Sequence, residues 1–304
     1  MHLKKIKQKT TNLSKIIKII ESQKNITLIN ILKLSRQISA LFQRAHNSKE
    51  MIQFLLSKYN VKNTLLASDS FSGATLKTIF KKQKSITHKT LWVYITEEEK
   101  YETNSYAKHE TNILHEVQPG DFFISVGKRA NSFCEAQNFQ VLEKFSENNV
   151  EQLSVALPTI ITNFLNNNGF HNVRFVINSS KLKQAYLDVL PLKELNFNLD
   201  VRGENLKDLV DLRKLKIYPN IDEFIASELN SYLTYISLTL LSESALIYQK
   251  YQLVAQNQKI NELEDKQKHL RLQLLRTKRE HEVEQISILS KKKDLLHTAK
   301  EQHE

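Results

Sequence analysis

Glycine and proline, the residues that most often interrupt helices, are scarce in this chain. Its 304 residues include five glycines and four prolines, and none of these lies within residues 1–72 or after Pro219. Proline breaks a helix because it lacks a backbone N–H, and glycine weakens one through its conformational freedom. Both ends of the chain can therefore form long uninterrupted helices, and the turns are confined to the middle.

Cysteine is scarce, and long apolar runs are absent. A single cysteine, Cys134, excludes an internal disulfide and suits a reducing compartment. No apolar stretch approaches the roughly 18 residues that a membrane span needs. The basic start is not followed by the apolar segment of a secretory signal. We therefore expect a cytoplasmic protein with no span of its own.

The motifs of common catalytic and cofactor sites do not occur. The chain contains no complete glycine-rich phosphate loop, no G-x-S-x-G and no H-E-x-x-H. Gly127-Lys128 matches only half of a phosphate loop, and one cysteine cannot build the common zinc sites. Cys134 is best interpreted as a small buried apolar group. We expect a non-catalytic chain with no cofactor or metal of its own.

The net charge of +11 is unevenly distributed. Residues 1–60 contain 12 Lys and Arg but only Glu21 and Glu50 as acids, whereas residues 220–304 contain 12 basic and 13 acidic residues. The basic segment requires an anionic partner or a solvated face. Nucleic-acid binders usually interleave aromatics with their basic residues, and this segment does not. We expect an acidic protein surface or solvent here and no nucleic acid.

Apolar residues recur three and four positions apart near both ends, which predicts two long helices. The first covers residues 5–58, with an irregularity near Lys24, and the second covers residues 220–304. Asn220 or Asp222 could cap the second. At 1.5 Å per residue they reach about 80 and 120 Å. A small domain cannot bury such lengths, so the helices are predicted to pair as a coiled coil.

The middle of the chain alternates short β-branched or aromatic runs with helical segments. Strands are predicted at 63–68, 90–95, 121–126 and 173–177, with edge strands at 140–145 and 195–201. Helices are predicted at 73–83, 104–115, 127–136 and 150–168. Such alternation favours a mostly parallel sheet with helices on its faces. The predicted domains are 1–60, 61–210 and 211–304.

The order helix, α/β domain, helix resembles the gamma subunit of F-type ATPases over nearly the whole chain. Residues 22–36, SQKNITLINILKLSR, are similar to that family's I-T-K-A-M-x-x-V-x-x-x-K-L-x-R. Residues 176–192 are similar to Y-x-K-F-x-S…L-L-P-L, and residues 241–245 to S-E-x-x-A-R-M. Near the end, REHEVEQI at 279–286 is similar to R-Q-A-x-I-T-x-E-I, with glutamate at position 280 where glutamine is usual.

The resemblance implies a fold and a role. The fold is a long antiparallel coiled coil of the two terminal helices, paired as a rod, with a Rossmann-like, mostly parallel α/β domain at one end. The role is the non-catalytic central shaft of an F1-type rotary ATPase, peripheral to the membrane. The partners implied are alpha- and beta-like subunits in a hexameric ring, which bind ATP and Mg. The implied ring contacts are Lys24, Lys33, Arg36, Arg279, Glu280, Gln285 and Ile286.

Where the family has T-S-D-R-G-L-C-G-G, this chain keeps only Ser68, Asp69 and Gly73, at the implied foot of the α/β domain. The foot's partner is then a small stalk subunit or a specialised motor component. Such losses, with an AT-rich composition, resemble the repurposed F1-like motors of mycoplasmas, including the gliding motor. Two alternatives stay open: a static coiled-coil scaffold or tether, and an enzyme with a helical dimerisation arm.

Overall fold

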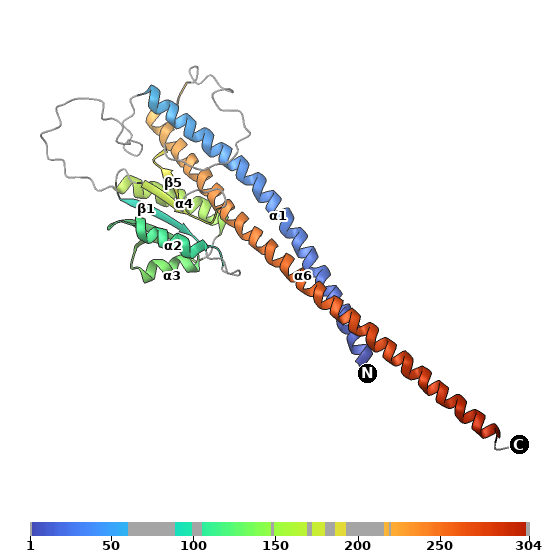
Figure 1. Ribbon diagram of the computed structural model, residues 1–304. Helices are drawn as coiled ribbons and strands as arrows, with labels where there is room; N and C mark the ends of the chain where they lie inside the picture. The colour runs from blue at the N-terminus through green and yellow to red at the C-terminus, as the bar shows by residue number, and fades with distance from the viewer. Residues whose placement is uncertain are drawn as a thin grey trace. The chain divides into compact units, whose positions relative to one another are not determined.

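The computed structural model describes residues 2–59, 89–98, 105–146, 149–168, 172–179, 186–192, 216–218 and 220–301 (Figure 1). The elements are α1 (His2–Lys58), β1 (Thr90–Ile95), α2 (Ser105–Glu116), β2 (Phe122–Val126), α3 (Lys128–Ala136), β3 (Gln140–Phe145), α4 (Val150–Asn168), β4 (Asn172–Val176), β5 (Leu187–Leu190) and α6 (Ile221–Glu301). The strands predicted at 63–68 and 195–201 and the helix predicted at 73–83 lie outside the described residues.

The predicted fold class is confirmed in its elements, with two long terminal helices and a central, mostly parallel α/β sheet. The predicted strands that fall on described residues match β1 to β4 to within one residue. The domain boundaries at 60/61 and 210/211 fall outside the described residues and stay predictions. The sequence analysis missed β5, which is four residues long and pairs antiparallel with β4.

The sheet has the strand order β3-β2-β1-β4-β5, and all its pairs except β4–β5 are parallel. Every residue of β1 is buried, because helices cover both faces of the sheet. Side chains alternate along a strand. Leu91, Val93 and Ile95 therefore pack in the core shared with α4 and α6, whereas Trp92 and Tyr94 pack with residues of α2 and α3.

The start of α6 is fixed by reciprocal capping. The Asn220 side chain accepts a hydrogen bond from the Glu223 backbone N–H at 2.8 Å and donates one to the Glu223 carboxylate at 2.8 Å. This satisfies a backbone donor that the first helical turn leaves without a partner in the helix. The prediction that Asn220 could cap the second helix is confirmed.

The chain forms two compact units, and both long helices pass through each of them. One unit contains residues 1–29 and 251–304, and the other contains residues 30–250. The start of α1 therefore groups with the later part of α6, and its end groups with the beginning of α6. This is the order of an antiparallel helix pair, and within each unit the two helices run in opposite directions (Figure 1).

A heptad repeat of covered positions runs along α1. One set of buried and half-buried residues is spaced in alternating steps of three and four, and beyond residue 41 further positions such as Phe42 are covered as well. The set consists of Leu3, Ile6, Thr10, Leu13, Ile17, Ile20, Lys24, Thr27, Ile31, Leu34, Ile38, Leu41, Ala45, Ser48, Ile52 and Leu55. We call these positions the α1 seam. The irregularity expected in the apolar spacing near Lys24 lies at two seam positions, Lys24 and Thr27, which carry polar side chains while the helix and its repeat continue. A 3.5-residue repeat is that of a left-handed coiled coil.

The later part of α6 has a matching seam. It consists of Leu253, Gln256, Ile260, Leu263, Gln267, Leu270, Leu274 and Thr277. From Lys278 to Lys291 every side chain is exposed, so the buried seam ends at Thr277. The two seams within this unit, from Leu3 to Thr27 and from Leu253 to Thr277, are equally long. Coiled-coil burial therefore stops at Thr277, although exposed apolar residues continue to Leu289.

Candidate functional site: the outer faces of the long helices

Each long helix carries a second apolar stripe that faces away from its seam. We call these the α1 outer face, formed by Ile19, Ile26, Ile29 and Leu32, and the α6 outer face, formed by Leu272, Leu275, Val283 and Ile286. All eight side chains are 55–66% exposed. With seam positions named a and d, all eight occupy positions b, c or f of their heptads when the α6 register is continued past Thr277, and in a coiled coil these positions point away from the partner helix.

The α1 outer face ends in two of the predicted ring contacts. Lys33 lies seven residues after Ile26, and Arg36 lies seven residues after Ile29, so both cations share the stripe's side of the helix. Both are exposed. Lys24 lies elsewhere, at a half-buried seam position. The structure thus brings Lys33 and Arg36 together with an exposed apolar stripe and places Lys24 between the helices.

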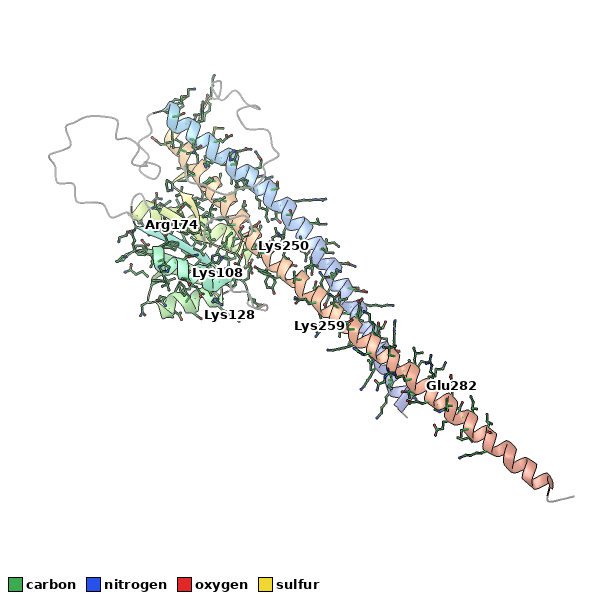
Figure 2. All side chains as sticks on the ribbon, viewed as in Figure 1. Lys108, Lys128, Arg174, Lys250, Lys259 and Glu282 are labelled. Carbon is green, nitrogen blue, oxygen red and sulfur yellow. The ribbon has the colours of Figure 1, made fainter. Side chains whose placement is uncertain are left out.

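The α6 outer face surrounds the predicted contact Arg279. Leu275 and Val283 lie four residues before and after it, and Leu272 and Ile286 lie seven residues before and after it. Arg279 is exposed, and among the described side chains none forms an ion pair with it, whereas the neighbouring Lys278 pairs with Glu282 at 3.7 Å. Glu282 is labelled in Figure 2. An arginine set in an exposed apolar stripe is the composition of a protein-binding face.

The remaining predicted contacts take different places. Ile286 belongs to the α6 outer face, whereas Glu280 and Gln285 are exposed beside it. Ser68, Asp69 and Gly73, the predicted foot, lie outside the described residues. Sequence reasoning missed the stripes as continuous faces, although counting heptads from Ile6 and from Leu253 would have revealed them.

The rest of the described surface carries few large apolar side chains. Those outside the long helices are four scattered residues, Leu114, Leu142, Val155 and Tyr218. Scattered apolar residues are normal on protein surfaces, whereas contiguous stripes mark interaction sites. The outer faces are therefore the strongest candidate site in the described part of the chain.

Charge distinguishes the two faces. Residues 1–29 hold seven lysines and a single acid, Glu21. Residues 251–304 hold 11 basic and 9 acidic residues. Complementary potential steers association. The α1 outer face therefore suits an acidic partner, whereas the α6 outer face depends on its apolar side chains and on Arg279.

At the half phosphate loop, Gly127-Lys128, the space beside the backbone is occupied by Thr96 of the same chain. Gly127 has φ of 94°, and a Cβ there would lie 2.3 Å from the Thr96 carbonyl oxygen. The Thr96 hydroxyl donates a hydrogen bond to the Val126 carbonyl at 3.0 Å and accepts one from the Ala130 N–H at 3.2 Å. The first turn of α3 is thus capped by a side chain from β1's end, where a phosphate loop would present free N–H groups.

Near this edge of the sheet, the side chains of Arg129, Glu110 and Tyr94 form hydrogen bonds and an ion pair with one another. Arg129 makes a two-pronged ion pair with Glu110 at 2.7 and 2.8 Å, and the Tyr94 hydroxyl donates to the same carboxylate at 3.1 Å. Burial, with the Glu110 charge adding to it, raises the pKa of Tyr94. Burial also raises the pKa of the Cys134 thiol to about 12. A thiol with that pKa is a poor nucleophile near neutral pH.

The described residues hold no further candidate site of two common kinds. They contain no group of three or more His, Cys, Asp or Glu placed to hold a metal ion. None of the helices, over the residues described, is long and apolar enough to cross a membrane.

Comparison with known proteins identifies the family by sequence. No protein-family model matches the chain. It is 33% identical over 293 residues to the uncharacterized protein UU050 of Ureaplasma parvum serovar 3, and the match covers 96% of this chain and 94% of that protein. The chain therefore belongs to the same family as UU050.

Solved structures with a similar arrangement are chains of ATP synthases. The rotor of the Euglena gracilis mitochondrial enzyme matches with a TM-score of 0.41 at 16% identity, covering 92% of this chain and 98% of that one. A second structure of that enzyme, with OSCP, F1 and c-ring, matches at 0.46 and 12%, covering 98% and 96%. The central stalk and c-ring of the Tetrahymena thermophila enzyme matches at 0.38 and 14%, covering 77% and 99%. Likenesses of this degree do not define a function.

Proposed function

We propose that this chain is the central rotor shaft, the gamma-like subunit, of an F1-type rotary ATPase. In this proposal a hexameric ring of alpha- and beta-like subunits binds ATP and Mg and performs the chemistry. The chain has no catalytic site or cofactor and acts in the cytoplasm, peripheral to the membrane as part of the complex. The motif resemblance along the sequence and the order of α1, the sheet and α6 support this proposal.

The observation that carries the proposal is the α6 outer face. The Leu272 and Leu275 end of this stripe lies opposite the buried seam, whereas Val283 and Ile286 lie on a stretch of α6 whose side chains are all exposed. Contiguous apolar surface of this kind suits a further partner. A shaft meets this requirement, because one side of each helix packs on the other helix and the opposite side slides against the ring. Apolar contacts are non-directional, so such a face can bind in several rotational positions. Arg279 adds one directional contact within it.

The shaft's contribution to the mechanism is asymmetry. A single coiled coil cannot contact three identical ring subunits in the same way, so each subunit is biased toward a different conformation. The bias requires contacts that differ between those conformations, and charged groups such as Lys33, Arg36 and Arg279 can supply them. Coupling then follows from the order in which the ring subunits meet these groups.

A crosslinking experiment tests the role. Leu272→Cys on the α6 outer face should form a crosslink to a ring ATPase subunit, whereas Leu270→Cys on the seam should not. Crosslinking through Leu272→Cys should stop ATP turnover, and reductant should restore it, because a locked shaft blocks rotation. A static scaffold predicts that turnover continues after crosslinking. Failure to recover any ring ATPase with the tagged chain contradicts the proposal outright.

The output of the motor is a finer part of the proposal. We propose that the foot drives something other than an ordinary proton ring, as in the gliding motor. The support is that the residues after the first predicted strand keep only Ser68, Asp69 and Gly73 of the family pattern, while the helical segments keep more. The composition of the complex purified from its own cells decides the matter. Stoichiometric c-type subunits bound to the complex would restore an ordinary ATP synthase.

A further inference from the structure

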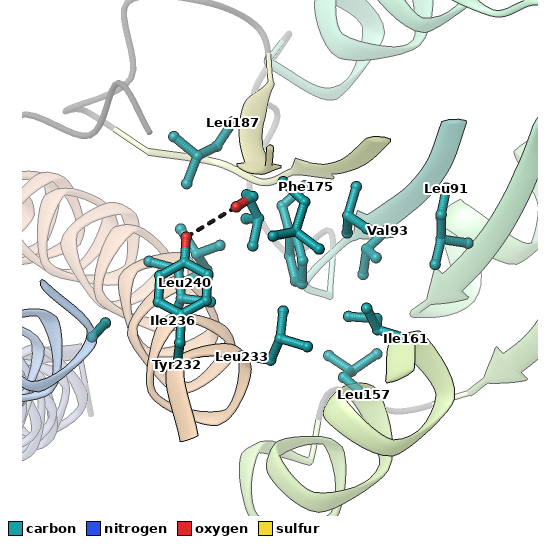
Figure 3. Close-up of a cluster of buried hydrophobic side chains, with 14 of the residues drawn as sticks. Leu91, Val93, Leu157, Ile161, Phe175, Leu187, Tyr232, Leu233, Ile236 and Leu240 are labelled. Carbon is teal, nitrogen blue, oxygen red and sulfur yellow. Dashed lines mark hydrogen bonds between the residues drawn. The ribbon is translucent and has the colours of Figure 1, made fainter. Parts of the chain in front are cut away.

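Two hydrogen bonds join α6 to the α/β domain at separate points. The Tyr232 hydroxyl donates to the Val189 carbonyl of β5 at 3.0 Å, as the dashed line in Figure 3 shows. The Ser179 hydroxyl, just beyond the end of β4, donates to the Glu243 carboxylate at 3.1 Å. The side chains of Tyr232 and Glu243 are both fully buried. One bond joins α6 to β5, and the other joins it to the segment that follows β4.

The two bonds share one face of α6. Tyr232 and Glu243 are eleven residues apart, which is about three full turns and roughly 16 Å along the helix. Ile236 and Leu240 lie between them on the same side and pack in the core beside Phe175 (Figure 3). The helix therefore presents a polar group at each end of an apolar patch.

The anchor points on the sheet have a matching separation. Val189 lies level with the start of β4, since β5 pairs Leu190 with Val173 and Asp188 with Arg174. Ser179 lies three residues beyond Val176, where β4 ends. Measured along the direction of β4, Val189 and Ser179 are thus at most about 20 Å apart. The helix lies along the strand and is held at both ends of that contact.

We propose that these two bonds are torsional pins, through which torque passes between α6 and the α/β domain. The hydrophobic effect is non-directional, so the hydrogen bonds add an orientation-specific restraint to the packing of α6. A hydrogen bond weakens steeply when its donor–acceptor distance lengthens or its donor–hydrogen–acceptor angle bends. Rolling or sliding of α6 against the sheet would therefore weaken the Tyr232 and Glu243 bonds at the same time. Tyr232, Glu243 and Ser179 are positioning residues in this role. The torque role rests on the proposed rotary function, whereas the pinning itself does not.

The first test uses the isolated full chain. Spin labels at Lys108→Cys on α2 (labelled in Figure 2) and Asn230→Cys on α6, both exposed, report the distance between domain and helix in a Cys134→Ala background. The double variant Tyr232→Phe with Ser179→Ala should broaden the distance distribution. Thr239→Val is the matched control, because its buried hydroxyl bonds only to its own helix at the Tyr235 carbonyl. An unchanged distribution in the double variant overturns the pins.

The second test measures torque transfer in the assembled complex. A bead attached at Lys108→Cys should show angular fluctuations with about two-fold larger variance in the double variant, because two directional contacts are lost. ATP turnover should stay unchanged, and Thr239→Val should behave as wild type. Broadened label distances with unchanged bead fluctuations overturn the torque role. A chain that joins no ring ATPase overturns the proposed function and the torque role, while the first test still decides the pins.

Discussion

Two stretches of the helix α6 differ completely in how far their side chains are exposed. Between Ser231 and Gln249 no side chain of α6 is exposed, whereas between Lys278 and Lys291 every side chain is exposed. The first stretch belongs to a run without lysine or arginine from residue 221 to residue 249, and the second mixes both signs of charge. Both contain regularly spaced apolar residues. The comparison teaches that apolar spacing shows where a helix can make contacts, while the distribution of charge shows which contacts lie within the chain.

Truncating a side chain in the buried stretch should have the largest effect. Leu240→Ala removes a fully buried side chain from the core beneath the sheet and should lower the free energy of unfolding by about 3 kcal/mol. Ile286→Ala, on the exposed stretch, should change it by less than about 0.5 kcal/mol. Denaturant unfolding of the two variants measures the contrast. Equal losses would mean that the exposed stretch is already buried in the isolated chain.

A second comparison of a crowded and an open position concerns two glycines of the α/β domain, Gly127 and Gly120. Gly127→Ala forces a side chain into a left-handed backbone and against the Thr96 carbonyl, so it should cost about 2 kcal/mol. Gly120→Ala has a similar φ of 98°, but its Cβ would only touch the Lys89 side chain at 3.6 Å. Comparing the two melting temperatures separates the clash from the backbone strain. The same loss in both variants would assign the whole effect to strain.

At one seam position, a substitution is expected to raise the stability of the chain. Lys24 is half-buried at a position where a coiled coil prefers an apolar side chain, so Lys24→Leu should raise stability by roughly 1 kcal/mol. Lys33→Leu, on the exposed outer face, should leave stability nearly unchanged and make the isolated chain more prone to self-association. Thermal unfolding and sedimentation measure these outcomes. Destabilisation by Lys24→Leu would show that the lysine has a partner in the seam.

The smallest effect on stability is expected at Arg279, together with a clear effect on function. Arg279→Ala removes an exposed charge, so unfolding should change by less than about 0.5 kcal/mol. In the assembled complex it should reduce torque and the coupling of ATP turnover to rotation. Arg271→Ala, exposed but outside the stripe, is the control. Rotation that is unaffected by Arg279→Ala would place the directional contact elsewhere.

The sequence predicted the larger architecture because its signals are local. The absence of glycine and proline indicated α1 and α6, β-branched runs indicated β1 to β4, and Asn220 indicated the cap. The strand β5 escaped because its four residues lie inside a segment with no regular alternation. Its pairing depends on β4, which is contributed by a different part of the chain.

The candidate site was predicted only in part, for a related reason. Arg279, Lys33 and Arg36 were identified from the family resemblance, and the structure places each beside an apolar stripe. Lys24 was grouped with them because the resemblance does not tell one side of a helix from the other. The bonds of Tyr232 and Ser179 join residues 43 and 64 positions apart from their partners, and no local pattern encodes such contacts.

The separation of the two long helices along the chain also affects how the protein is made. The seam of α1 is complete at residue 55, but its partner begins only at Ile221. At the usual 5–20 residues per second, a ribosome needs about 8 to 33 s to bridge that interval. During this time α1 presents its seam and its outer face to the surroundings together. We expect the newly made helix to be more prone to aggregation in this interval than after α6 has emerged, because its apolar positions are not yet covered.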